Sequence, residues 1–127
     1  MTRRVVILAL ALVATATLSG SQEDPIQQLM RAKTRYAHRL LDAIVMEDFV
    51  TIRDQAFRLK AVAETGDFQV LDTPEYVRQN DAIIEATDRL IDAAREESGD
   101  AAALAYMDIT LKCVHCHHYL REHVSEP

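Results

Sequence analysis

The feature that most constrains this chain is the stretch Cys113-Val114-His115-Cys116-His117, which contains both of its cysteines. This C-x-x-C-H pattern is typical of covalent attachment of a c-type haem. On an α-helix, residues three and four positions apart share a face, so Cys113, Cys116 and His117 would point the same way. Two thiols can then bond to the two vinyl groups of one haem, while the imidazole of His117 binds the iron as proximal ligand. The motif therefore predicts one covalently bound haem c.

The two cysteines allow three other interpretations. A thioredoxin-like redox motif would need a βαβ setting, and no strand is predicted. A zinc-binding helical module would need four ligands, with His115 and His118 added to His117, but adjacent residues on one helix diverge around its axis. A structural disulfide leaves His117 without a role. Zinc is kept as a distant alternative to haem.

The first 21 residues predict an export signal. Arg3 and Arg4 precede the apolar run Val5–Leu18, and small residues suited to cleavage follow. The run is short for a membrane-spanning helix, so an uncleaved anchor is the less favoured alternative. Because c-type haem is generally attached outside the bacterial cytoplasm, we expect a periplasmic protein whose mature domain spans 22–127.

The net charge of the chain indicates which kinds of partner it can bind. The chain has 14 basic and 20 acidic residues, and the signal contains two of the basic ones and none of the acidic ones. The mature part then has 12 basic against 20 acidic residues, a formal charge of −8. Such a chain repels nucleic acid and anionic lipid, and a redox partner with a basic patch is the better electrostatic match.

After the signal, the pattern predicts four helices. Asp24 before Pro25 is a helix start, and apolar residues follow at three- and four-residue steps to about Glu47. Asp48 is predicted to cap a second helix, which ends near Gly66. The segment 66–73 is predicted to be a loop, and Thr73 before Pro74 starts the third helix.

Gly99 is predicted to end the third helix and Asp100 to cap the last one. One broad side of this last helix is predicted to face the core, with the residues Ala103, Tyr106, Met107, Thr110, Cys113, His117 and Leu120. Four helices with short connections predict an antiparallel four-helix bundle, an all-α fold with haem near the C-terminus. The first half of the first helix, from Leu29 to Tyr36, would then lie beside the motif.

Together, the predicted bundle, the export signal and a C-x-x-C-H motif close to the C-terminus resemble the cytochrome c prime and cytochrome c-556 family. Members also have a basic residue four positions after the haem-binding histidine, and Arg121 is that residue here. The resemblance implies thioether bonds from Cys113 and Cys116, axial ligation by His117 and a cationic haem environment from Arg121. It also implies a homodimer through the first two helices.

The chain departs from the family in the first helix, where members often have an Arg-Gln pair before the distal residue and this chain has Met30-Arg31-Ala32-Lys33. The family pattern therefore does not identify the sixth iron ligand, which is inferred instead from the positions of the methionines. Met107 lies on the same helix as His117, and Met46 lies about 24 Å along the first helix from Met30, so Met30 is the candidate distal ligand. Packing in the core is the alternative role for Met30.

The distal ligand separates two functions. A methionine ligand suits electron transfer, which we expect, whereas an apolar distal side would leave the iron open to NO or CO. Lys33 and Tyr36 are candidates to line this pocket or to meet the haem propionates. His38 and His123 are predicted to be surface residues, and neither His115 nor His118 is predicted to be a ligand. The sequence shows no recognisable arrangement of catalytic residues beside the haem motif, so an enzyme is not expected.

Overall fold

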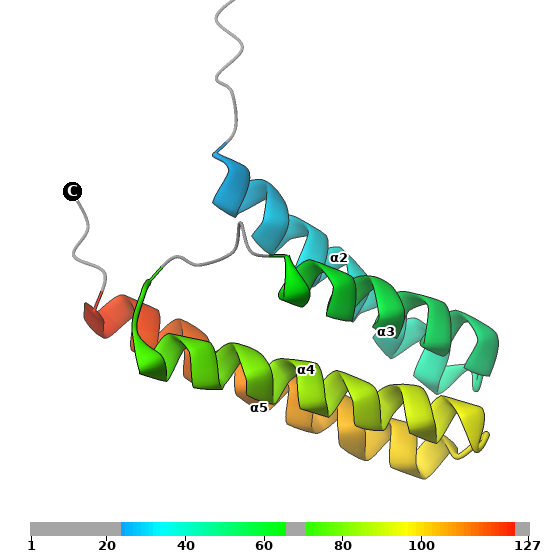
Figure 1. Cartoon of the computed structure of the whole chain (residues 1–127). Helices are drawn as coiled ribbons and strands as arrows, with labels where there is room; N and C mark the ends of the chain where they lie inside the picture. The colour runs from blue at the N-terminus through cyan, green and yellow to red at the C-terminus, as the bar shows by residue number, and fades with distance from the viewer. Residues whose placement is uncertain (1–23, 66–70, 124–127) are drawn as a thin grey trace, which may run out of the picture.

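The computed structural model describes residues 24–65 and 71–123, and within these ranges it contains four α-helices and no strand. The helices are α2 (Pro25–Val45), α3 (Phe49–Glu64), α4 (Pro74–Arg95) and α5 (Gly99–His123), as Figure 1 shows. The all-α prediction is therefore confirmed. No helix among these residues is both long enough and apolar enough to span a membrane. The predicted signal at 1–21 and the loop positions 66–70 lie outside the described residues.

Three helix starts form where capping chemistry predicts them. The side chains of Asp24, Asp48 and Thr73 each accept a hydrogen bond from a backbone N–H two or three residues further on, at 3.3, 3.0 and 3.2 Å. Prolines follow Asp24 and Thr73, where the missing N–H has no helical partner to lose. The predicted starts of the first three helices are confirmed.

The start of the last helix was predicted wrongly. Helix α4 ends at Arg95, and α5 already begins at Gly99, so Gly99 does not terminate a helix and Asp100 lies inside the first turn of α5. The hydroxyl of Ser98 accepts from the N–H of Ala101 at 3.3 Å, so Ser98 does the capping. Glycine is common after helix ends, but here a glutamate adopts the conformation that glycine favours.

The α2–α3 turn and the α4–α5 turn have the same construction. Glu47 and Glu97 both have a φ of 52°, in the left-handed region. The N–H groups of Asp48 and Ser98 each reach back to a carbonyl five residues earlier, at 2.9 and 3.0 Å. These bonds close the exposed carbonyl end of α2 and α4, a Schellman arrangement that normally uses glycine.

The two turns lie at one end of the molecule, opposite the first residues of α2 and the last of α5 (Figure 1). A Cβ atom added to Gly99 would come within 2.7 Å of the Glu47 carboxylate, so the turns are in contact. Helix α3 packs between α2 and α4, α4 packs on α5, and α2 meets α5 over a much smaller area.

The main core lies nearest these turns. Its side chains come from all four helices and are at most 8 % exposed: Leu40, Ala43, Ile52, Ala56, Leu59, Ala86, Leu90, Ile91, Ala93, Ala94, Ala102, Ala105 and Ile109. Alanines line much of this core, and small side chains let helices approach closely. We call this part of the bundle the turn half. The other part, made of residues 25–37, 60–64, 74–85 and 110–123, is the cysteine half.

Candidate haem-attachment site on α5

Helix α5 places the two cysteines on its inner side. Cys113 is half-buried and packs against the core of the turn half, and Cys116 is only 8 % exposed. Both thiols are free, so they do not form a disulfide. His117 is one residue beyond Cys116 and is exposed. The helix thus offers two inward thiols with an imidazole at their edge.

The predicted inner side of α5 was only partly right. Ala103, Met107 and Thr110 were expected to face the core and are exposed, Met107 by 58 %. The buried positions of α5 are instead Ala102, Ala105, Ile109 and Cys116, which share one side at three-, four- and seven-residue spacings. Apolar residues occur on both sides of this helix, so the pattern of apolar letters did not define one face.

Tyr106 marks the side of α5 that faces α2. It lies seven residues before Cys113 and packs against the main core. Burial raises the pKa of its phenol, and the nearby Cys113 and Asp42, which is on α2, add to the rise. Sequence reasoning did not single out Tyr106 as a site residue, although its seven-residue spacing from Cys113 was the available signal.

Lys33 brings a positive charge from α2 to the two thiols. Burial lowers the pKa of its ammonium, and this effect is opposed by Cys113 and Cys116, which both lie near enough to interact with it. Conversely, burial raises the pKa of each thiol, and the Lys33 charge counteracts the rise. Residues on α2 and α5 that are 80 positions apart in sequence therefore face one another at the motif.

Met30 lies on the same face of α2 as Lys33, since the two are three residues apart. Its side chain is half-buried, like those of Ile26 and Leu29. This neighbourhood is the one expected for the first half of the first helix. Ligation of iron by Met30 itself stays a prediction.

The remaining histidines occupy the surface. His38 and His123 are exposed, as expected. The ring of His123 stacks on Tyr119 with centroids 4.1 Å apart, and Tyr119 also hydrogen-bonds the hydroxyl of Thr73 at 2.9 Å, which ties α5 to the start of α4. His118 lies 3.4 Å from the carboxylate of Glu122. Arg121, the residue implied by the family resemblance, is exposed.

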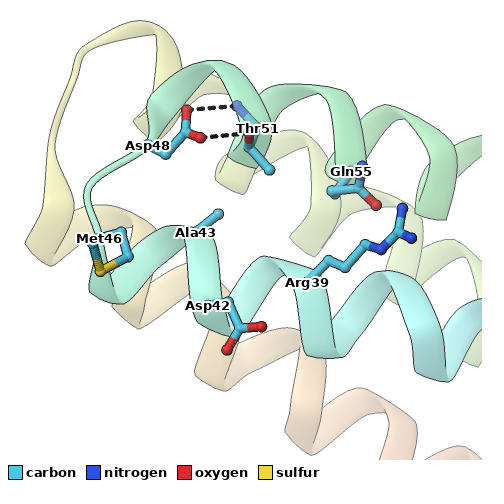
Figure 2. Close-up of a pocket in the computed structure, with 7 residues that line it drawn as sticks. All are labelled: Arg39, Asp42, Ala43, Met46, Asp48, Thr51 and Gln55. Atoms are coloured by element: carbon cyan, nitrogen blue, oxygen red, sulfur yellow. Dashed lines mark hydrogen bonds between the residues drawn. The ribbon is translucent and has the colours of Figure 1, made fainter.

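Grooves away from the thiols are lined by other residues. Figure 2 shows one between α2 and α3, where the Arg39 side chain extends toward Gln55 and the carboxylate of Asp48 holds Thr51. A second groove between α4 and α5 is lined by Gln79, Lys112 and His115, among others. In 24–65 and 71–123, no three His, Cys, Asp or Glu side chains are grouped so that they could hold a metal ion.

No family model, curated protein or solved structure matches this chain. What can be said of its function therefore rests on the α5 motif and on the residues of α2 that face it.

Proposed function

We propose that this protein is an exported c-type haem protein that carries electrons. The observation that supports this most directly is the pair of free thiols, Cys113 and Cys116, on the inner side of α5 with His117 at their edge. The donor set fits haem c, which needs two thiols and one imidazole from a single helical turn. A structural zinc ion would need further ligands.

Each residue of the motif has a defined task. The thiols of Cys113 and Cys116 would hold the haem, each by addition of its S–H bond across a vinyl group, which needs no oxidant. His117, whose side chain is exposed, would offer a ring nitrogen to the iron. Bound haem supplies a one-electron iron couple whose potential depends on the axial ligands. Half-buried apolar side chains of α2, such as Leu29, are suited to pack on the porphyrin.

The helices are proposed to form an antiparallel bundle around this group. The contact between the two turns, Glu47 against Gly99, supports the alternating direction. So does the interaction of Lys33 with both thiols, because α2 and α5 then run in opposite directions past each other. With that geometry, Met30 would lie about 4.5 Å from Lys33 toward the start of α2, level with the turn of α5 that contains His117.

Met30 is accordingly the proposed sixth ligand. A thioether is nearly apolar and polarisable, so it can occupy a half-buried position without a large desolvation cost. If Met30 only packs, the iron keeps one position open, and binding of NO or CO becomes the function instead. Arg121 is proposed to add positive charge near the haem, while the acidic remainder of the chain favours a basic redox partner.

The attachment test uses acid denaturation followed by organic extraction. Haem should remain on the wild-type polypeptide and on His118→Ala, a matched control one residue from the ligand. Cys113→Ala and Cys116→Ala should each lose one thioether, and His117→Ala should lose the axial bond and change the spectrum. Extractable haem in the wild type, or one zinc ion per chain, would end the proposal.

The ligand test compares Met30→Ala with Met46→Ala. Met46 is 77 % exposed at the end of α2 and serves as the control. The oxidised wild type and Met46→Ala should show the weak far-red band of sulfur bound to iron, and Met30→Ala should lose it and bind CO. A wild type that already binds CO readily would favour the gas-binding alternative, and a spectrum unchanged by Met30→Ala would remove Met30 from the ligand set.

Export has its own test. Cell fractionation should recover the haem-bearing protein from the periplasm. Its mass should show that about 21 residues have been removed from the N-terminus. A cytoplasmic form that retains Met1 would contradict this.

A further inference from the structure

Helix α2 has a run of positive charge in an otherwise acidic protein. Between residues 25 and 41, the charged side chains are Arg31, Lys33, Arg35 and Arg39, and the sequence has no acidic residue there. The rest of the mature chain has 8 basic and 20 acidic residues. The positive charge is therefore concentrated on one helix, which is also the helix that contains Met30.

Three of these cations share the outer side of α2. Arg31, Arg35 and Arg39 are exposed and follow one another at steps of four residues, so each is turned by only about 40° from the one before it. We call them the α2 row. Lys33 lies about 160° around the helix from Arg31 and is half-buried on the opposite side. Because α2 packs mainly on α3, its outer side is open to a partner.

Acidic residues border the α2 row at its ends. Asp24 caps α2, and Asp42 lies three residues after the last arginine of the row. Asp54 of α3 also interacts with that arginine, but it is bound at 2.9 Å by Arg58, which brings a further guanidinium to this side of the bundle. Arg35 is seven residues from Asp42 and eleven from Asp24, so the middle of the row is its most positive part.

We propose that the α2 row docks the acidic surface of a second redox protein, which is distinct from the basic partner that the rest of the chain favours. This inference rests on the proposed haem function, since an electron carrier must meet both a donor and an acceptor. Complementary charge steers the encounter and fixes the orientation of two proteins. Surfaces of opposite sign would let donor and acceptor bind at different places on this small bundle.

The α2 row also lies close to the proposed haem. Arg31 directly follows Met30, the proposed distal ligand, and is turned about 100° from it around the helix axis. A protein seated on the row would be separated from the iron by α2 alone, and a helix with its side chains is about 10 Å wide. The row can therefore hold a partner near the group that exchanges the electron.

Other polyanions fit the row less well. An anionic membrane binds an amphipathic helix whose apolar side can enter the lipid, but the apolar side of α2 is turned into the bundle, where Leu40 and Ala43 are buried. Lipid and nucleic acid surfaces also extend well beyond a row that is about 12 Å long, and they would meet the acidic rest of the chain. A protein can present one acidic patch of matching size.

A small anionic oxidant tests the row in the haem-loaded protein. Ferricyanide takes one electron from reduced iron and becomes ferrocyanide, without transfer of a proton or a bond. Repulsion by a protein with a formal charge of −8 would make this rate rise with added salt. We expect the rate to fall instead, because the α2 row attracts the trianion near the haem. A rate that rises with salt would overturn the proposal.

Variants of Arg35 locate the attraction. At about 10 mM ionic strength, Arg35→Glu should lower the ferricyanide rate about tenfold, and Arg35→Lys should leave it unchanged. Arg95→Glu makes the same change of charge at the end of α4, in the turn half, and should lower the rate less than about twofold. The reduction potential of each protein is measured as well, so that a change in driving force is separated from docking. Equal losses from the two glutamate variants would rule out a local site.

Direct binding gives a readout that does not need electron transfer. Polyglutamate is the probe for an acidic surface, and it should shift amide NMR signals of the wild type mainly in 30–39, with clearly smaller shifts in Arg35→Glu. Phosphatidylglycerol vesicles should not bind. Shifts centred elsewhere, or binding to the vesicles and not to polyglutamate, would overturn the proposal. A chain that takes up no haem would instead remove the proposed function, and the polyglutamate titration distinguishes the two failures.

Discussion

The turn half and the cysteine half of this bundle differ in which helices are buried. In the turn half, all four helices contribute fully buried side chains to one core. In the cysteine half, α3 and α4 still bury Ala63, Tyr76 and Ile83. Helix α2 has no buried residue before Leu40, and Cys116 is the one buried residue of α5 after Ile109.

The difference shows that burial is lost on two particular helices, not at the end of the bundle as a whole. Simple fraying would affect α3 and α4 as well, because their ends lie in the same half. The apolar residues Ile26, Leu29 and Met30 are half-buried on α2, and Cys113 is half-buried on α5. Half-buried apolar side chains on two facing helices are what a cofactor between them would use, which agrees with the proposed function.

The largest expected effect is on the free energy of unfolding, and it compares one leucine of the turn half with one leucine of the cysteine half. Leu90→Ala removes a side chain that is completely buried and should lower the free energy of unfolding by about 2–5 kcal/mol, since a cavity remains in a closed core. Leu29→Ala in the haem-free protein should cost clearly less, because its side chain is already partly in water. Urea denaturation measures both, and equal losses would mean that the two halves are packed alike.

Hydrogen exchange should resolve the effect of haem along the chain. Attachment is expected to slow exchange of backbone amides in 25–37 and 113–123 by roughly tenfold or more, because a haem bonded to α5 would pack against α2 and accept a ligand from Met30. Amides around Leu40, Ile52 and Leu90 should change less. Uniform protection of the whole bundle would contradict a boundary between the halves.

The two left-handed glutamates offer a smaller test within the turn half. Glu97→Gly should raise the free energy of unfolding by about 0.5–1 kcal/mol, because glycine adopts a φ of 52° without steric cost. The matched control is Glu96→Gly, one residue earlier with a φ of −82°, which should lower stability. Thermal unfolding compares the two, and a loss from Glu97→Gly would show that its side chain matters more than its backbone.

These elements also show what the sequence could and could not predict. The helix starts at Asp24, Asp48 and Thr73 were predictable because a capping side chain acts on residues two or three positions away. The end of α4 was not predictable, because nothing in the sequence distinguishes Glu97 from any other glutamate. The buried side of α5 was predicted only in part, and Met107 was wrongly expected to face the core, because apolar residues occur on both sides of that helix.

The candidate site divides in the same way. The spacing of Cys113, Cys116 and His117 is local, so the sequence was enough to place them on one turn of helix. The position of Lys33 against both thiols depends on how α2 and α5 pack, and no local pattern determines that. Sequence reasoning proposed Lys33 only as one of two candidates, with Tyr36, to line the pocket or meet the propionates, and its interaction with the cysteines required the fold.

The smallest expected effect is a change in how much acid pH lowers the melting temperature, and it tests the cap at the start of α3 in the turn half. Hydrogen bonds from the hydroxyl and N–H of Thr51 lower the pKa of Asp48. A carboxyl whose pKa is lower in the folded chain than in the unfolded chain stabilises the fold above its unfolded pKa, and this contribution is lost as the pH falls through its folded pKa. Asp48→Asn keeps a capping oxygen but does not titrate. Its melting temperature should therefore fall less than that of the wild type between about pH 6 and about pH 3. Asp72→Asn, at an exposed acid outside the helices, should follow the wild type. If Asp48→Asn and the wild type lose the same number of degrees, the charge of Asp48 contributes nothing to the stability of the turn half.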